Sequence, residues 1–341
     1  MSEIAIIGAG AWGTGMAIVL GRKGTHRVRL WAHEADVCES ITPKRLNQKF
    51  LPGRPIPDSV SASTDLAATL AGAQIVVSVM PSQHCRALFE RMRPLIQPQT
   101  LIVSATKGLE EGSLQRMTEV ITQVLKRDDP ETPAVGALSG PSFAQEVARG
   151  DPTAITIASE EPALLRTVQQ EFSDSSFRVY TNSDVIGVEL GGALKNIVAI
   201  AAGICDGLGF GHNSVAALIT RGLAEMTRLV VACAGRAETM AGLAGLGDLV
   251  LTCTGGLSRN RSVGVELGRG RKLPDIIAGM HGMVAEGVFT TTAAVGLAHA
   301  RNVEMPITEQ MHAILHHGRS PREAIQELMA RSGKSEIGAG S

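Results

Sequence analysis

The sequence is poor in cysteine, and its five cysteines are scattered along 341 residues without a C-x-x-C pair. An odd, unpaired set argues against a disulfide framework, and the missing pairs argue against a zinc site. We therefore expect no bound metal, and reduced thiols at Cys38, Cys85, Cys205, Cys233 and Cys253.

An excess of charge is also missing, because 32 Lys and Arg stand against 33 Asp and Glu and give a net charge of -1. A neutral chain lacks broad attraction to nucleic acid or to an anionic membrane, so a small-molecule partner is favoured. Apolar runs break well before the ~20 residues of a membrane span. The most apolar stretch, Ile197 to Phe210, contains Asp206, and the first residues do not form a secretory signal. We expect a cytoplasmic protein.

Two common catalytic motifs are absent as well. The sequence has neither the G-x-S-x-G of many hydrolases nor the G-x-x-x-x-G-K-[ST] of NTPases. His312, His316 and His317 include an i, i+4 pair on an expected helix. Without a nearby carboxylate or a third ligand, these histidines indicate a solvated helix face rather than a metal site.

The length suggests two domains, at roughly 150 residues per domain. In residues 1–183, β-branched runs alternate with amphipathic helical stretches, which is typical of an α/β, Rossmann-like, doubly wound parallel sheet. In residues 184–332 helical spacing takes over, so we expect a second, all-helical domain, followed by a frayed tail at 333–341. The expected strands are 4–7, 28–31, 75–79, 101–104, 134–138, 154–157 and 177–180. Prolines and a glycine at 52, 53, 55 and 57 predict an irregular surface loop over 47–58.

A glycine motif follows the first expected strand directly. It reads Gly8-Ala9-Gly10-Ala11-Trp12-Gly13 and opens a helical stretch. The first glycine permits a tight turn, the second lets the backbone approach a pyrophosphate, and the third lets the helix pack on the strand. An ordinary glycine turn is the alternative for an isolated hexapeptide. The strand before it and the helix after it favour a dinucleotide site.

The ribose of a dinucleotide is usually recognised about 20 residues after this motif, where an acid selects NAD. Counting from Gly13 reaches His33, which can donate to a 2′-phosphate and so favours NADP. Glu34 keeps NAD possible, and His33 as a simple polar strand end is the other alternative.

Small and polar residues follow three neighbouring expected strands, in the segments 80–83, 105–109 and 139–144. Because ligands of a doubly wound sheet bind outside the carboxyl ends of its strands, these segments predict a crevice, with Lys107 facing an anionic substrate. Each turn alone is compatible with plain loop chemistry.

In the second domain, Lys195 and Asn196 interrupt an otherwise apolar helix. Burial would lower the pKa of Lys195 toward neutrality and let it exchange a proton with a carbinol oxygen. Lysines more often extend to the surface, so the pattern alone leaves that alternative open. Farther on, Asp248 is framed by glycines, and Ser258-Arg259-Asn260 indicates a capped helix N-terminus suited to an anion or, alternatively, a solvated cap.

These segments together resemble the bacterial NAD(P)-dependent glycerol-3-phosphate dehydrogenases over nearly the whole chain. The resemblance rests on Gly8 to Gly13, Ala105 to Glu110, Leu138 to Ala144, Glu189 to Asn196 and Leu243 to Asp248. It continues in order through Ser258 to Asn260, Val284 to Gly287 and Glu304 to Ile307. Ala11 stands where the family often has Ser, and Gly15-Met16 replaces a commoner Ala-Leu, which puts one coenzyme hydrogen bond in doubt.

The resemblance implies reversible reduction of dihydroxyacetone phosphate to sn-glycerol 3-phosphate, a phospholipid precursor, by a homodimer that uses NADP or NAD. It implies catalytic roles for Lys195, Lys107 and Asp248. The implied substrate contacts are Lys107, Gly140, Ser142, Lys195, Asn196, Asp248, Ser258, Arg259 and Asn260. The implied coenzyme contacts are Gly8, Gly10, Ala11, Trp12, Gly13, His33, Lys107, Ala144, Arg259, Val284 and Glu286.

Two alternatives remain at this point. A related two-domain dehydrogenase acting on a 3-hydroxy acid would share both halves, but it would need an arginine fork for a carboxylate instead of a capped phosphate site. A non-catalytic dinucleotide sensor would keep Gly8 to Gly13 but would not need Lys195 in an apolar helix.

Overall fold

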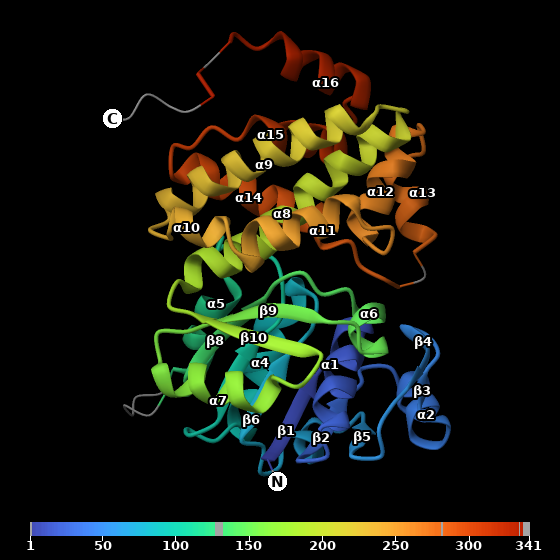
Figure 1. Ribbon diagram of the computed structural model, residues 1–341, viewed down its shortest axis with the longest axis vertical. Helices are drawn as coiled ribbons and strands as arrows, with labels where there is room; N and C mark the ends of the chain where they lie inside the picture. Colours follow the sequence, from blue (N-terminus) through green and yellow to red (C-terminus); the bar gives the residue numbers. More distant parts are fainter. Residues whose placement is uncertain (1, 127–131, 281, 334, 337–341) are drawn as a thin grey trace.

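The computed structural model describes residues 2–126, 132–280, 282–333 and 335–336. It has an N-terminal α/β part and a helical C-terminal part, which lie end to end along the long axis (Figure 1). The structure thus confirms the predicted fold class. The last expected segment, 333–341, falls largely outside the described residues.

An eight-stranded sheet forms the N-terminal part, in the order β10-β9-β8-β7-β6-β1-β2-β5. Its strands are β1 (Ser2–Ile7), β2 (His26–Trp31), β5 (Val60–Ser63), β6 (Ile75–Ser78), β7 (Leu101–Ser104), β8 (Val135–Ser139), β9 (Thr153–Ala158) and β10 (Phe177–Asn182). Strand β1 lies between β2 and β6, so the strand order reverses beside it. This reversal is where open α/β sheets bind their ligands.

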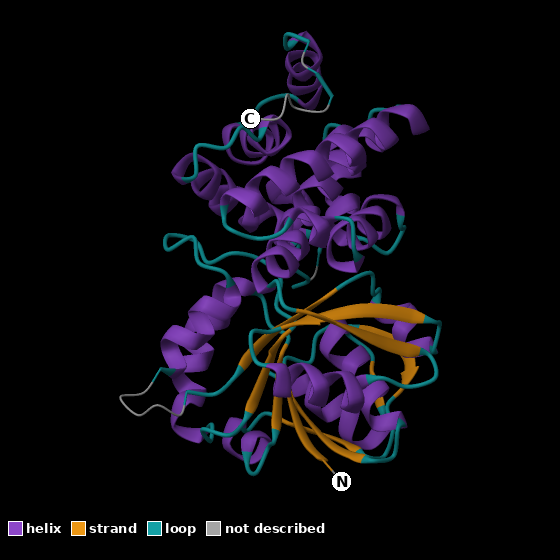
Figure 2. Ribbon diagram, turned by 60° about the vertical axis from the view of Figure 1, so that its left-hand side comes forward, coloured by secondary structure: helices purple, strands orange, loops and turns teal. Residues whose placement is uncertain are grey.

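Helices cover both faces of this sheet (Figure 2). Along β1, Ile4 and Ile6 belong to one buried cluster, and Ala5 and Ile7 belong to another on the opposite face. Burial on both faces explains why the strands are nearly continuous apolar runs. The helices are α1 (Ala11–Arg22), α2 (Ala35–Lys44), α6 (Ala144–Arg149) and α7 (Pro162–Phe172) with the first cluster, and α3 (Leu66–Leu70), α4 (Cys85–Met92) and α5 (Met117–Leu125) with the second.

The sheet is parallel, as expected, except at one junction. Strand β9 runs antiparallel to β8, whereas β10 is again parallel to β9. The connection after β8 contains only the short helix α6, which packs against α1. A parallel return needs a longer crossover over the face of the sheet, so this connection brings the chain back beside the strand it has just left.

The predicted irregular loop over 47–58 was wrong in part. Strands β3 (Leu46–Asn47) and β4 (Leu51–Pro55) form a small antiparallel sheet of their own. Proline cannot donate to a ladder, but a two-stranded sheet has open edges that tolerate it at Pro52 and Pro55. Leu51 is fully buried and anchors this small sheet.

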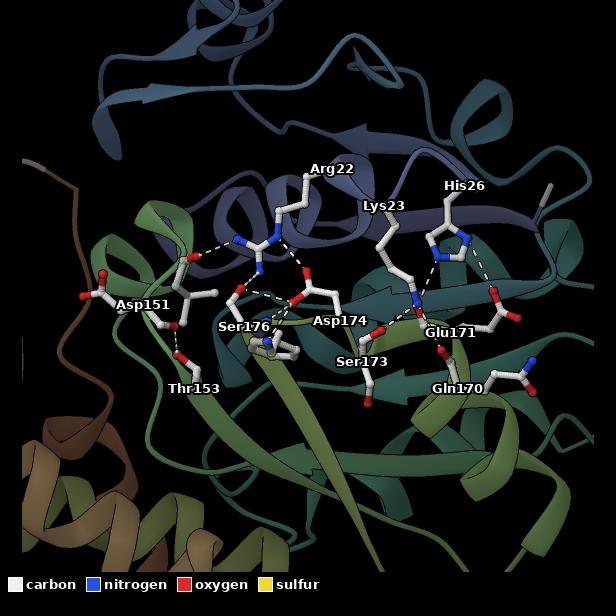
Figure 3. A network of polar contacts seen from close by, with 12 residues as sticks. Arg22, Lys23, His26, Asp151, Thr153, Gln170, Glu171, Ser173, Asp174 and Ser176 are labelled. Carbon is white, nitrogen blue, oxygen red and sulfur yellow. Dashed lines mark hydrogen bonds and ion pairs between the residues drawn. The ribbon is translucent and has the colours of Figure 1, made fainter.

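The turn between α1 and β2 is tied to the end of α7 (Figure 3). The Lys23 ammonium donates to three carbonyl groups at 2.8 to 3.0 Å, those of Gln170, Glu171 and Ser173. Arg22 Nε lies 2.7 Å from Asp174 Oδ2. Cations at a helix C-terminus neutralise its partial negative charge, so these contacts fix α7 and the following strand against α1.

Strand β10 lies at the edge of the sheet, yet side chains of its own chain bind outward backbone groups at Phe177 and Val179. The Val179 carbonyl accepts from Gln169 Nε2 at 2.9 Å, and the Val179 N–H donates to Ser173 Oγ at 3.2 Å. The Phe177 N–H donates to Asp174 Oδ1 at 2.7 Å.

The C-terminal part is built around one long helix, α8 (Val185–Gly207). By length and composition α8 resembles a membrane span, but 83% of its most apolar window is buried among the surrounding helices. The other helical elements of this part are α9 (His212–Ala232), α10 (Ala237–Met240), a π-helical turn (Leu243–Gly247), α11 (Asp248–Thr254), α12 (Arg259–Gly268), α13 (Leu273–Ala278), α14 (Glu286–Ala300), α15 (Pro306–His317) and α16 (Pro321–Ala330). A Cβ on Gly203 would lie 2.0 Å from the Arg261 carbonyl oxygen, so glycine lets α8 and α12 touch backbone to backbone.

Candidate active site

Two lysines and one aspartate meet where the helical part faces the sheet. Lys195 of α8 forms an ion pair with Asp248 Oδ1 and donates to Thr252 Oγ1 at 2.8 Å. Lys107, in the loop after β7, places its Nζ 2.6 Å from Asp248 Oδ2. The Asp248 side chain is 1% exposed, Lys195 7% and Lys107 22%. With both lysines protonated the cluster carries a net positive charge, and Lys107 is its most accessible member.

Burial sets the proton affinities of this cluster. It lowers the pKa of Lys195, because the ammonium loses its hydration; Lys107 lowers it further, and Asp248 opposes the shift. Burial alone would raise the pKa of Asp248, but the two ammonium groups hold it below its ordinary value. Asp248 therefore stays ionised, and Lys195 is the member that can change protonation near neutral pH.

Glycines bring the cluster together. A Cβ on Gly191 would lie 2.6 Å from the Ala244 carbonyl oxygen, and one on Gly192 would lie 2.6 Å from Ser139 Oγ. Larger residues would push α8 away from the end of β8 and from the π-helical turn. That turn leads directly into Asp248, and π-helical turns often occur at functional sites.

The capped helix predicted at Ser258 is the start of α12. Ser258 Oγ accepts from the Arg261 N–H at 3.2 Å, as an N-cap does. Asn260 Nδ2 donates to Asn196 Oδ1 at 3.0 Å, and Asn260 Oδ1 accepts from the Gly287 N–H at 2.9 Å. These contacts join α12 to α8 and α14 beside Lys195. The Arg259 side chain is solvent-exposed.

The glycine motif forms the turn between β1 and α1. A Cβ on Gly8 would lie 2.4 Å from the Val79 carbonyl oxygen, and one on Gly13 would lie 1.9 Å from the Gly8 carbonyl oxygen. Around a Cβ on Gly10 there is nothing within 4 Å. The turn thus needs glycine at Gly8 and Gly13 for close packing, and it leaves open space at Gly10, beside the N-terminus of α1. This arrangement fits the pyrophosphate of a dinucleotide.

The other predicted coenzyme contacts lie around this turn and across the junction between the two parts. His33 is exposed just after β2, with its ring centroid 5.9 Å from that of Trp31. Ala144 lies against α1 at Gly15, and Trp12 is in the first turn of α1. Val284 and Glu286 lie at the start of α14.

Glu286 contacts a residue of the N-terminal part. Its carboxylate accepts from Ser82 Oγ at 2.9 Å and from the Ser82 N–H at 3.3 Å. Burial raises the pKa of this carboxyl group. The Ser142 hydroxyl, in contrast, donates within its own turn to the Gly140 carbonyl at 2.9 Å.

Sequence reasoning missed Thr252, although a signal was available. Thr252 lies four residues after Asp248 on α11, which is the spacing that places two side chains on one helix face. The partnership of Ser82 with Glu286 spans both parts of the chain, and local sequence carries no signal for it.

The histidines that we interpreted as a helix face lie on α15. His316 Nε2 is 3.1 Å from the Val288 carbonyl oxygen. Within the described ranges, no three His, Cys, Asp or Glu side chains are grouped as metal ligands would be.

Known proteins match this chain over nearly its whole length. Residues 3–165 and 184–326 match the family models described as the N-terminus and the C-terminus of NAD-dependent glycerol-3-phosphate dehydrogenase. A glycerol-3-phosphate dehydrogenase [NAD(P)+] of Koribacter versatilis is 66% identical over 99% of both chains. One of Acidobacterium capsulatum is 57% identical over 98% of this chain and 100% of the relative.

Solved structures agree with these matches. The glycerol-3-phosphate dehydrogenase of Coxiella burnetii superposes with a TM-score of 0.92 at 44% identity, over 97% of this chain and 99% of that one. A ketopantoate reductase of Ralstonia eutropha, at 18% identity and a TM-score of 0.60, shares the fold alone. The chain therefore belongs to the NAD-dependent glycerol-3-phosphate dehydrogenase family.

Proposed function

We propose that the protein reversibly reduces dihydroxyacetone phosphate to sn-glycerol 3-phosphate with NADPH or NADH. The observation that carries the proposal is the buried Lys195–Asp248 pair, which lies beside the carboxyl ends of β7 and β8, on the side of the sheet where a dinucleotide would bind. The bacterial relatives named for this activity support it over their full length. Two alternatives are less well supported. A 3-hydroxy acid dehydrogenase leaves the cap of α12 without a role, and a non-catalytic sensor leaves the buried Lys195 without one.

Lys195 is the proposed acid and base. In the reduction it donates a proton to the carbonyl oxygen at C2, and in the oxidation it accepts that proton back. Asp248 and Thr252 hold the Lys195 nitrogen in one position. Lys107 attracts the anionic substrate beside the same carboxylate. When bound, the reduced nicotinamide supplies the hydride to C2.

The proposed phosphate site is the start of α12. Backbone N–H groups at a helix N-terminus favour an anion, and Arg259 adds a charge-assisted hydrogen bond. Ser258 and Asn260 shape this end, and Asn196 holds Asn260. Gly140 and Ser142, in the turn after β8, complete the substrate side.

The proposed coenzyme site uses the glycine turn for the pyrophosphate and His33 for the ribose. We propose a preference for NADP, because His33 can donate to a 2′-phosphate where an acid would repel it. His33→Asp should move the preference toward NADH, measured as the ratio of kcat/KM for the two coenzymes. A wild-type protein that already uses NADH better than NADPH would contradict this preference.

The remaining proposed coenzyme contacts are Gly8, Gly10, Ala11, Trp12, Gly13, Lys107, Ala144, Arg259, Val284 and Glu286.

We place this activity in the cytoplasm, in a homodimer that supplies glycerol 3-phosphate for phospholipid synthesis. We propose neither a nucleic-acid nor a membrane partner, since the net charge is only -1. Light scattering during gel filtration measures the assembly, and a monomeric mass would remove the dimer from the proposal.

The deciding experiment follows oxidation of NADPH and of NADH with dihydroxyacetone phosphate, beside acetoacetyl and succinic semialdehyde substrates. We expect turnover with dihydroxyacetone phosphate. Turnover with either of the other substrates, and none with the first, would replace the proposed reaction by that of a 3-hydroxy acid dehydrogenase.

A further inference from the structure

The side chain of Asn47 contacts the glycine turn from a distant part of the chain. Its Nδ2 donates to the Ala9 carbonyl oxygen and to Thr14 Oγ1, both at 2.8 Å. Its Oδ1 accepts from the Phe50 N–H at 3.1 Å. Because an N–H can donate only to the oxygen end of an amide, the Phe50 contact fixes which end of Asn47 faces the turn. Asn47 is 0% exposed, so water does not compete for these contacts.

Thr14 of α1 adds a second donor to the same carbonyl. Its hydroxyl accepts from Asn47 and donates to the Ala9 carbonyl oxygen at 3.3 Å. Thr14 is also 0% exposed. The Ala9 carbonyl is therefore held from the inside of the protein by two side chains that also bind each other.

This anchoring fixes the direction of the next N–H group. A trans peptide unit is planar, so the Ala9 carbonyl and the Gly10 N–H point in opposite directions. With the carbonyl held toward Asn47, the Gly10 N–H points away from it, and Gly10 itself borders open space. If the peptide unit rotated, the carbonyl oxygen would face that side and repel an anion.

We infer that Asn47 is a positioning residue for the coenzyme, which orients the Gly10 N–H toward the pyrophosphate. The inference rests on the proposed function, because it needs a dinucleotide at this turn. It also gives a role to the small β3–β4 sheet, which carries Asn47 and is anchored by Leu51. Asn47 acts through the backbone of Ala9 and Gly10.

The test compares NADPH with a fragment of it that lacks both the pyrophosphate and the nicotinamide riboside. The fragment, adenosine 2′-monophosphate, has the same phosphorylated adenosine as NADPH. NADPH binding is followed by nicotinamide fluorescence, and adenosine 2′-monophosphate binding by its competition with NADPH. Asn47→Ala should weaken NADPH binding about tenfold, the effect of one or two lost buried hydrogen bonds, and leave the affinity for adenosine 2′-monophosphate unchanged. Thr14→Val, which removes the second donor, should weaken NADPH binding about threefold.

Ser59→Ala is the matched control. The Ser59 hydroxyl donates to the Gly21 carbonyl at 2.8 Å, at the opposite end of the same helix α1, so both affinities should stay at their wild-type values. Wild-type affinity for NADPH in Asn47→Ala, or an equal loss for both ligands, would overturn the inference. If Asn47→Ala does not fold, Thr14→Val decides in the same way. A wild-type protein that binds neither NADPH nor NADH overturns the proposed function instead.

Discussion

The proton affinity of Lys195 depends on its burial and on two charged neighbours, Asp248 and Lys107. Burial lowers its pKa, and the pair with Asp248 keeps the nitrogen in place. Oxidation of glycerol 3-phosphate needs the neutral amine, so its rate should rise with pH through a midpoint below the ordinary lysine value of roughly 10.4. Reduction needs the ammonium, and its rate should fall over the same range.

Removing the Lys195 amine should damage the chemical step. A positioned acid or base contributes about 10²- to 10⁴-fold, so Lys195→Ala should lose that much turnover in both directions and still bind the coenzyme. Lys195→Arg should recover little, because guanidinium stays protonated. Coenzyme titration and rates in both directions measure these effects. Near wild-type turnover in Lys195→Ala would remove Lys195 from the mechanism.

Arg259 should act on substrate affinity. Losing a charge-assisted hydrogen bond costs about 1.5 to 3 kcal/mol, so Arg259→Ala should raise the KM for dihydroxyacetone phosphate roughly tenfold or more. Arg269→Ala is the matched control, since Arg269 follows the other end of α12 and pairs with Glu266 there. A KM that does not change in Arg259→Ala places the phosphate elsewhere.

For single residues, the sequence predicts a role where the residues next to it in the chain reveal that role. Lys195 stands out as a charge in an apolar helix, and Gly8 to Gly13 follow a strand directly. Asn47 does not stand out, because its partners Ala9 and Thr14 lie far away in sequence. A buried polar side chain is recognised only when its partners are known.

Among the elements, α9 and α15 are joined by the buried carboxylate of Glu225. It accepts from the N–H groups of Ile307 and Thr308 at 2.7 and 3.3 Å, in the first turn of α15. Burial raises the pKa of Glu225 to about 7, against the hydrogen bonds and Arg228, which lower it. The folded protein therefore keeps a proton on Glu225 at pH values where the unfolded chain has lost it.

This proton difference gives the free energy of unfolding a pH dependence. Between the ordinary glutamate pKa, roughly 4.3, and about 7, stability should fall as pH rises, by up to about 1.4 kcal/mol per pH unit from this group. Urea unfolding measures it. Glu225→Gln should have a shallower slope in that range, while Glu309→Gln, an exposed change in the same turn, is the control. Identical slopes in wild type and Glu225→Gln would contradict the raised pKa.

A helix or strand was predictable where the pattern of its own residues determines its structure. Strand β7 lies at Leu101–Ser104, where the apolar run predicted it. Strand β5, at Val60–Ser63, was not expected, because two serines in four residues hide the strand pattern. The direction of β9 depends on how α6 packs on α1, and the strand's own sequence does not record that contact.

At the scale of the whole molecule, a buried carboxylate links the two parts of the chain. Glu189 of α8 accepts from the Thr118 N–H at 2.9 Å and pairs with Arg116 Nη1 at 2.6 Å, at the start of α5. Lys107 and Arg116 lie at the two ends of the segment that joins β7 to α5. Glu189 thus holds this segment against the helix that carries Lys195.

Breaking this link should cost stability. Removing one partner of a buried ion pair leaves the other uncompensated, so Glu189→Ala should lower the free energy of unfolding by about 3 to 5 kcal/mol. Glu119→Ala removes the exposed partner of the same arginine and the carboxylate that caps α5 at the Arg116 N–H, and should cost about 1 to 2 kcal/mol. Denaturant unfolding of the three proteins measures both. Equal, small losses would show that the link contributes nothing between the two parts.

We propose that the domain boundary lies at 183/184, between β10 and α8, close to this link.

The covered edge at β10 has a consequence for how copies of the protein meet. An open edge strand offers a row of donors and acceptors that can template pairing with a foreign strand, and it is the usual starting point of cross-β growth. Here Gln169, Ser173 and Asp174 already occupy the outward groups of Val179 and Phe177. The stretch of β10 from Phe177 to Val179 is therefore closed to β-augmentation by a second copy.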